Sequence, residues 1–278
     1  TVVMKIDLVG DKNRGLAMGL NEFSGYLAVG LTALASGFIA ERYGIAPYPF
    51  YMGFGIAVGG FLLSVLWVRD TRHFVETESH SAEHLELKNV FVETTFKNKT
   101  LSSVTQAGLV NNLNDGMIWG LFPMLLLNIG FNIAQVGTLA AVYPTVWGLG
   151  QLFTGKMADH VDNKKMLFWG MGLQGLAIAA LTQTSSFYAI AALAALLGLG
   201  TALVYPTFLT VIASKVHPGQ RAKSIGSFRL WRDLGYAFGA LISGVIADIW
   251  SIPAAVLSIG VITLFSALVI QIRMPQSA

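Results

Sequence analysis

The sequence predicts an all-α polytopic membrane protein. Hydrophobic residues make up 54% of the 278-residue chain and charged residues only 12%, which is roughly half the charged fraction of a typical soluble domain. Several apolar blocks also exceed the roughly 18 residues needed to cross a bilayer as a helix. None of them alternates apolar and polar residues with a period of two, as the strands of a membrane β-barrel do. The chain contains no cysteine, which excludes disulfides, thiolate chemistry and cysteine metal sites.

Eight membrane-spanning helices are expected when the sequence is read in windows of about 20 residues. In chain order they lie near residues 15–40, 48–68, 104–128, 134–155, 166–183, 187–213, 222–247 and 252–272. Residues 1–9 (TVVMKIDLV) resemble the end of a ninth helix. The sequence is therefore expected to start inside a longer protein.

Basic residues distinguish the two sides of the membrane. They cluster in every second turn, whereas the alternate turns near residues 41–48, 129–133, 184–186 and 248–251 hold Arg42 alone. Because Lys and Arg concentrate in cytoplasmic loops, the basic turns and the C-terminus are expected to be cytoplasmic. Residues 69–103 then form a polar cytoplasmic linker, which is either a solvated tether or carries a short interfacial helix around residues 85–91.

The first two spans and the last two share an internal repeat. Residues 36–41 read SGFIAE and residues 243–248 read SGVIAD, and at the same offset Arg14 falls on Arg221. Four spans precede the last pair, so symmetry predicts two six-helix halves, of which eight helices in total are present. Residues 1–68 would be the C-terminal part of the first half, 69–103 the interdomain linker, and 104–278 the complete second half.

Two six-helix halves related by a parallel repeat resemble the major facilitator superfamily. Residues 155–165 (GKMADHVDNKK) are similar to a loop motif of that superfamily, from which His160, Asp162 and Asn163 depart. The turns DKNRGLAMG and PGQRAKSIG also resemble its Arg-Gly-x-Ala-x-Gly turn. Residues 19–37 lack the Gly-x-x-x-Gly-Pro motif of its antiporters. The resemblance implies a transporter that works by alternating access, with a cytoplasmic gating set made of Gly155, Asp159, Lys164, Lys165, Arg14 and Arg221.

Asp115 is one of few ionisable residues inside the expected spans, and such residues usually face a bundle interior or a wet cavity because they are costly in lipid. Asn111 stands four residues before it, on the same helix face. This face is expected to bind substrate or accept a proton. The alternative is a hydrogen-bond clamp between helices.

Two Tyr-Pro pairs, at Tyr143 and Tyr205, also lie inside spans. Proline bends a helix and frees a backbone carbonyl, so these positions are expected to be hinges or cavity walls, with ordinary helix packing as the alternative. Gln151 extends the polar face of the first kinked helix.

Residues 228–239 (FRLWRDLGYAFG) place three charges inside one span. Arg229 and Asp233 are four residues apart, so they are expected to neutralise each other. Arg232 then lacks a partner on its own helix and is expected to meet an anionic or polar solute, or an acidic side chain elsewhere. The repeat places Glu22 at the position equivalent to Arg229. The alternative is a fixed salt-bridge network.

No catalytic motif accompanies these residues. All five histidines lie in the expected loops, and the spans contain no haem ligands, zinc-binding pair or nucleophile elbow. An enzyme, a cofactor and a nucleic-acid partner are therefore not expected. The sequence predicts a secondary active transporter of a small anionic or polar solute, with proton coupling as one option. The alternatives are a multidrug efflux exporter and a truncated membrane protein without transport activity.

The expected partners are the lipid bilayer, a small-molecule solute and, if transport is proton-coupled, protons. The protein is expected to be a multi-pass, monomeric component of the cytoplasmic or plasma membrane. The solute, its direction of movement and the coupling ion are not determined by the sequence.

Overall fold

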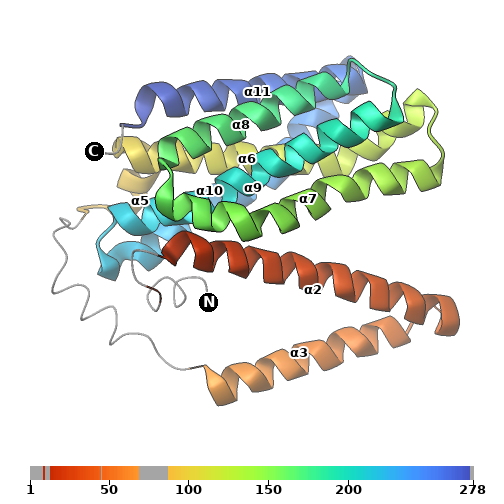
Figure 1. Cartoon of the computed structure of the whole chain (residues 1–278), viewed down its shortest axis with the longest axis horizontal. Helices are drawn as coiled ribbons and strands as arrows, with labels where there is room; N and C mark the ends of the chain where they lie inside the picture. The colour runs from red at the N-terminus through yellow and green to blue at the C-terminus, as the bar shows by residue number, and fades with distance from the viewer. Residues whose placement is uncertain (1–8, 10–12, 45, 69–86, 276–278) are drawn as a thin grey trace.

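The computed structural model describes residues 9, 13–44, 46–68 and 87–275, and these residues form helices without any strand (Figure 1). The described part contains eight long helices, and each coincides with one predicted span to within a few residues. They are α2 (Arg14–Tyr43), α3 (Tyr48–Trp67), α6 (Lys99–Ile129), α7 (Ile133–His160), α8 (Asn163–Leu181), α9 (Phe187–Lys215), α10 (Arg221–Ile249) and α11 (Ile252–Arg273). The expected tail of a ninth helix, residues 1–9, falls on residues outside the described part except for residue 9.

The predicted linker ends earlier than expected. Helix α6 begins at Lys99 and is preceded by α5 (Val90–Val92) and the π-helix η2 (Glu93–Lys97). The Asn98 side chain fixes this start, because its Oδ1 accepts hydrogen bonds from the amides of Thr100 and Leu101, both 3.0 Å long. The expected interfacial helix at residues 85–91 is represented only by α5, and residues 69–86 lie outside the described part.

The predicted loop at residues 155–165 is also mostly helical. Helix α7 continues to His160 and α8 begins at Asn163. Asp162 caps α8 by accepting a hydrogen bond of 2.9 Å from the Lys165 amide. An N-cap of this kind satisfies an amide that has no partner inside the helix, so the connection needs only residues 161 and 162.

Glycines let the helices approach closely. Helix α10 packs on α6, and a Cβ atom at Gly235 or Gly239 would contact the backbone of Leu109 or Leu113 in α6. Gly198 plays the same part between α9 and α7, and Gly260 between α11 and α8. Small residues at such contacts are typical of helices that associate in lipid.

Replacing Gly239 with Ala is expected to lower the Tm of the purified protein. The added methyl group would meet the Cα and C atoms of Leu113 at 2.8 Å, and overpacking of this kind costs about 1–3 kcal/mol. Thermal unfolding in detergent measures the effect. Gly244→Ala on the same helix is the matched control, because its Cβ meets nothing within 4 Å. Equal Tm values for the two variants would contradict tight packing of α6 and α10.

By length and composition alone, three of the described helices, α3, α9 and α11, are apolar enough to cross a membrane. The others carry more polar residues, many of which are buried inside the bundle. Helix α6 has a polar stretch at residues 111–115, with an apolar cluster packed on each side of it. One cluster includes Leu101 of α6 and Phe228 of α10, and the other includes Phe122 of α6 and Leu139 of α7. Polar groups therefore lie near the middle of the bundle.

Helices α2 and α3 form a hairpin on one side of the bundle, with α2 next to α7 (Figure 1). Helices α2 and α7 lie close together where α2 begins and separate toward the end of α2. We call the end where α2 and α7 meet the basic end, because it carries Lys156, Lys165, Lys215 and Lys223. None of the residues of α3 is buried.

Candidate functional site

Asp115 lies at the centre of the bundle and is fully buried. The hydroxyl of Tyr143 on α7 donates a hydrogen bond to Oδ1 of Asp115, and the hydroxyl of Tyr236 on α10 donates one of 3.2 Å to Oδ2. Thr201 on α9 places its Oγ1 3.4 Å from the Tyr143 hydroxyl. Both carboxylate oxygens thus have donors, and Asp115 joins α6 directly to α7 and α10.

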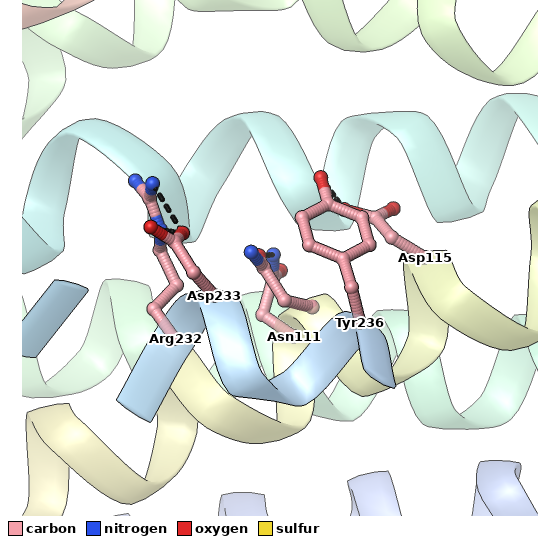
Figure 2. Close-up of polar contacts among 6 residues, drawn as sticks. Asn111, Asp115, Arg232, Asp233 and Tyr236 are labelled. Carbon is pink, nitrogen blue, oxygen red and sulfur yellow. Dashed lines mark hydrogen bonds and ion pairs between the residues drawn. The ribbon is translucent and has the colours of Figure 1, made fainter. Parts of the chain in front are cut away.

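Local sequence explains how Tyr236 reaches Asp115. Gly116 follows Asp115, and the backbone of Tyr236 and Ala240 passes directly over it. A side chain at residue 116 would hold α10 farther away. Figure 2 shows the Tyr236 ring spanning the gap between α10 and the Asp115 side chain on α6.

Arg232 and Asp233 form a second polar group about one turn away on α10 (Figure 2). Nε and Nη2 of Arg232 donate to Oδ1 of Asp233 at 2.8 and 2.6 Å. The guanidinium carbon also lies 5.6 Å from the centre of the Tyr205 ring, a cation–π distance. The Arg232 side chain is 14% exposed, whereas that of Asp233 is 56% exposed.

The predicted pairing of Arg229 with Asp233 is wrong, and Arg232 does have a partner on its own helix. The spacing of four residues permits the first pair, but the Tyr205 ring holds the Arg232 guanidinium beside Asp233 instead. Nε of Arg229 is buried and finds no hydrogen-bond partner within the part of the chain that the structure describes.

Asn111 and Asp115 share a face of α6 as predicted, but they are not hydrogen-bonded to each other. Nδ2 of Asn111 donates to Oδ1 of Asn112 at 3.2 Å. The other amide atoms of this pair, Oδ1 of Asn111 and Nδ2 of Asn112, are buried without a partner among the described residues. Figure 2 shows Asn111 between the Arg232–Asp233 pair and Asp115.

Helix α7 contributes further buried polar atoms. Both amide atoms of Gln151 and Nε1 of Trp147 lack a hydrogen-bond partner among the described residues. Leaving such a group unsatisfied costs about 1–3 kcal/mol, so buried atoms of this kind are normally bonded to water or a ligand. The predicted residue Gln151 is therefore buried on α7, one turn from Trp147, with polar atoms that no described residue satisfies.

An aromatic cluster surrounds Trp147. Its ring lies 4.1 Å from Tyr26, 5.2 Å from Tyr205 and 5.7 Å from Tyr143, measured between ring centres. Tyr143 and Tyr205 were expected at the site, whereas Tyr26 and Tyr236 were not. Tyr236 follows Arg232 by four residues and so shares its helix face, a spacing that could have identified it. No comparable signal marks Tyr26.

Glu22 on α2 lies at the edge of this site. Its Oε1 accepts a hydrogen bond of 2.9 Å from Nδ2 of Asn21, and its charge is within electrostatic range of Arg232. The repeat matched Glu22 to Arg229 in sequence, but the structure brings it near Arg232.

A separate contact joins α2 and α7 at the basic end. The Asp159 carboxylate accepts hydrogen bonds from the backbone amides of Gly15 (2.6 Å) and Leu16 (2.9 Å). Gly19 packs on Gly155, and a Cβ atom at Gly155 would lie 2.9 Å from the Cα of Gly19 and 2.7 Å from the Gly15 oxygen. A carboxylate at a helix N-terminus is favourable because it faces amides and the positive end of the helix dipole.

The described contacts of the rest of the predicted gating set lie elsewhere. Arg221 is buried and its Nε donates to the Ala213 oxygen at 3.0 Å, which ties the start of α10 to the end of α9. Lys164 is buried on α8, whereas Lys165 is exposed. The side chain of Arg14 lies outside the described residues.

The long helices around a buried ionisable centre define a polytopic membrane protein. A sequence model of the Major Facilitator Superfamily matches residues 1–106 and 104–277. The chain belongs to this superfamily, whose members are transporters rather than enzymes. Within the described ranges, no three His, Cys, Asp or Glu side chains are grouped as metal ligands.

Relatives and solved structures are similar over most of this chain. The multidrug resistance protein MdtG of Proteus mirabilis (strain HI4320) is 21% identical over 272 residues, which cover 95% of this chain and 66% of MdtG. The inner membrane transport protein YnfM of Escherichia coli (strain K12) is 27% identical over 157 residues, covering 56% of this chain and 38% of YnfM. The human organic anion transporter MFSD10 superposes with a TM-score of 0.76 at 14% identity, covering 97% of this chain and 66% of that structure. The chain thus spans no more than about two thirds of these proteins.

Proposed function

We propose that the protein is a secondary active transporter that moves a small anionic or polar solute by alternating access, with protons coupled through Asp115. Residues 1–68 and 104–278 would be two halves that rock about the central site, joined by the cytoplasmic linker at residues 69–103. The observation that carries this proposal is the fully buried Asp115 carboxylate, held by tyrosine hydroxyls from two other helices.

Proton binding at Asp115 would change how the helices are joined. A charged carboxylate accepts hydrogen bonds about twice as strong as those of a neutral group, so ionised Asp115 holds α7 and α10 more tightly than protonated Asp115. Protonation and helix packing are then linked, because a ligand shifts a conformational equilibrium by its difference in affinity for the two states. This linkage is the physical requirement for proton-coupled transport.

The solute would bind between Arg232 and the Trp147 cluster. Arg232 supplies a guanidinium that is stacked on Tyr205 and paired with Asp233, so an anionic solute would compete with the Asp233 carboxylate for it. The buried amide atoms of Asn111 and Gln151 supply donors and acceptors that have no partner among the described residues. A solute with one anionic group and further polar atoms matches this set of side chains.

The structure supports a state in which the basic end is closed. Asp159 and Gly155 join α7 to α2 there. Farther along, a cavity of about 270 Å³ opens between these two helices, lined by Phe23, Tyr26, Leu27, Leu31, Pro144, Thr145, Gly148 and Leu149. If the basic end is cytoplasmic, as the positive-inside rule predicts, this state faces outward.

Multidrug efflux is the second candidate function. MdtG relatives are named multidrug resistance proteins, and the four rings at Tyr26, Tyr143, Trp147 and Tyr205 offer an aromatic surface for apolar compounds. Export of apolar dyes from loaded vesicles, insensitive to small anions, would favour this candidate over anion transport. A chain without transport activity would move neither apolar dyes nor small anions.

Proton-coupled solute flux in proteoliposomes tests the proposal, with Arg232 as the informative residue. We expect Arg232→Ala to lower the apparent affinity for an anionic solute by about tenfold or more, because a charge-assisted hydrogen bond contributes about 1.5–3 kcal/mol. Arg232→Lys should lose less, since it keeps the charge but not the planar fork. Vesicles are loaded at one pH and diluted into another, and solute uptake and proton uptake are recorded together. Unchanged affinity in Arg232→Ala would refute the anion site.

A further inference from the structure

Residues 87–98, which we call the strap, are held firmly against the helices at the basic end. Gln220 forms two hydrogen bonds with the backbone of Leu87, of 2.8 and 3.1 Å. Thr94 and Ser224 share a buried hydrogen bond of 2.8 Å, and Nε1 of Trp231 donates to Oγ1 of Thr95 at 3.2 Å. The strap is therefore a fixed part of the bundle surface beside the first turns of α10.

A cavity of about 530 Å³ lies between the strap and α10. Its wall combines two lysines with neutral polar and apolar side chains: Leu87, Lys88, Asn89, Val90, Phe91, Gln220, Lys223 and Ser227. Lys88 comes from the strap and Lys223 from α10, and both are exposed. Neither ammonium group has an ion pair with any residue in the described part of the chain. Two cations that line one cavity repel each other, and an anion bound between them removes that repulsion.

The position of the strap indicates which kind of anion the cavity would bind. It ends where α6 starts, and the start of a membrane-spanning helix lies near the bilayer surface, so we place the strap at that level. Phe91 and Phe96 project from it with 42% and 58% of their surface exposed. Exposed aromatic and basic side chains on one surface segment are typical of elements that lie in the headgroup region of an anionic membrane.

We infer that this cavity binds the phosphodiester of an anionic phospholipid, with Lys88 and Lys223 contacting the headgroup and Phe91 the start of an acyl chain. Free phosphate carries the same charge but makes no use of the apolar part of the wall, so the lipid fits the lining better. This site is distinct from the central polar site, and lipid binding here does not depend on the proposed transport function. A lipid bound here would bridge the strap and α10, the helix that carries Arg232 and Tyr236.

The test uses the purified protein in neutral detergent with three probes: phosphatidylglycerol, phosphatidylcholine and inorganic phosphate. Bound lipid is counted by native mass spectrometry, and the Tm is measured in parallel. We expect phosphatidylglycerol to be retained and to raise the Tm more than phosphatidylcholine. Lys88→Gln/Lys223→Gln should lower its apparent affinity by about fivefold for each lysine removed. Lys88→Arg/Lys223→Arg should restore binding, which separates loss of charge from loss of folding.

The matched control is Lys156→Gln/Lys215→Gln, which removes two exposed lysines from the same end but outside this cavity. The control should retain phosphatidylglycerol. An equal loss of phosphatidylglycerol binding in both double variants would show that the effect comes from general surface charge, and it would overturn the site. Stabilisation by inorganic phosphate alone, matching that by phosphatidylglycerol, would overturn the lipid assignment in favour of a soluble anion.

Discussion

Asp115→Asn is expected to abolish the pH dependence of solute uptake and to lower accumulation by about tenfold or more. Asn cannot bind and release a proton, and its Nδ2 cannot accept a hydrogen bond. One of the two hydroxyls from Tyr143 and Tyr236 would therefore lose its acceptor. A hydrogen bond to a charged group contributes about 1.5–3 kcal/mol, and each 1.4 kcal/mol corresponds to about a tenfold change in an equilibrium constant.

Uptake into proteoliposomes between pH 5 and 8 measures this effect, and two further variants make it specific. Tyr143→Phe removes one donor but leaves a carboxyl group that can ionise, so its uptake should be reduced but still pH-dependent. Asp248→Asn changes an exposed acid near the end of α10 and should behave like the unchanged protein. A normal pH profile in Asp115→Asn, with a normal Tm, would remove Asp115 from the coupling mechanism.

Gly155→Leu is expected to separate α2 from α7 at the basic end and to reduce transport to near background. The side chain would have to occupy space now filled by the Gly15 oxygen and the Cα of Gly19, both of which lie within 3 Å of the position that a Cβ atom at residue 155 would take. Overpacking typically costs about 1–3 kcal/mol, and a backbone obstacle cannot move aside as a side chain can. The closed state would therefore lose most of its population, whereas the open state would be unaffected.

Spin labels can measure this separation directly, because the chain has no native cysteine. Labels at Asn13 and Lys156, both exposed, report the distance between the two helices at the basic end. Gly155→Leu should shift the distance distribution to longer values. Gly172→Leu is the matched control, since its Cβ faces open space on α8. An unchanged distribution in Gly155→Leu would contradict the role of this contact in closing the basic end.

The helices could be predicted from the sequence because their cause is local. Long apolar blocks separated by basic or polar turns leave a membrane protein few options, and all eight predicted spans are helical. The ends of the helices are harder to predict, because a single capping side chain decides each of them. Asn98 extends α6 toward the linker, and Asp162 shortens the predicted loop before α8.

The members of the central site could be predicted in part, but their partners could not. Asp115 and Arg232 are noticeable because ionisable groups are rare inside membrane helices. Which groups they contact depends on how helices distant in sequence are rotated against each other. Tyr236 reaches Asp115 only because Gly116 lets α10 approach, and Arg232 turns to Asp233 because of Tyr205. The four-residue spacing on α10 alone favours the pair Arg229–Asp233, whereas the structure pairs Arg232 with Asp233.

The hydrogen bonds between Asp159 and α2 have a consequence for the genetics of this protein. Their donors are backbone amides, which every residue except proline possesses. Exchanging the side chain of Leu16 therefore leaves the donor in place, whereas any loss of the Asp159 carboxylate removes both acceptors at once. Substitutions should be tolerated better at residue 16 than at residue 159. Second-site mutations that rescue an Asp159 variant should accordingly arise elsewhere on the surface between α2 and α7, and not at residue 16.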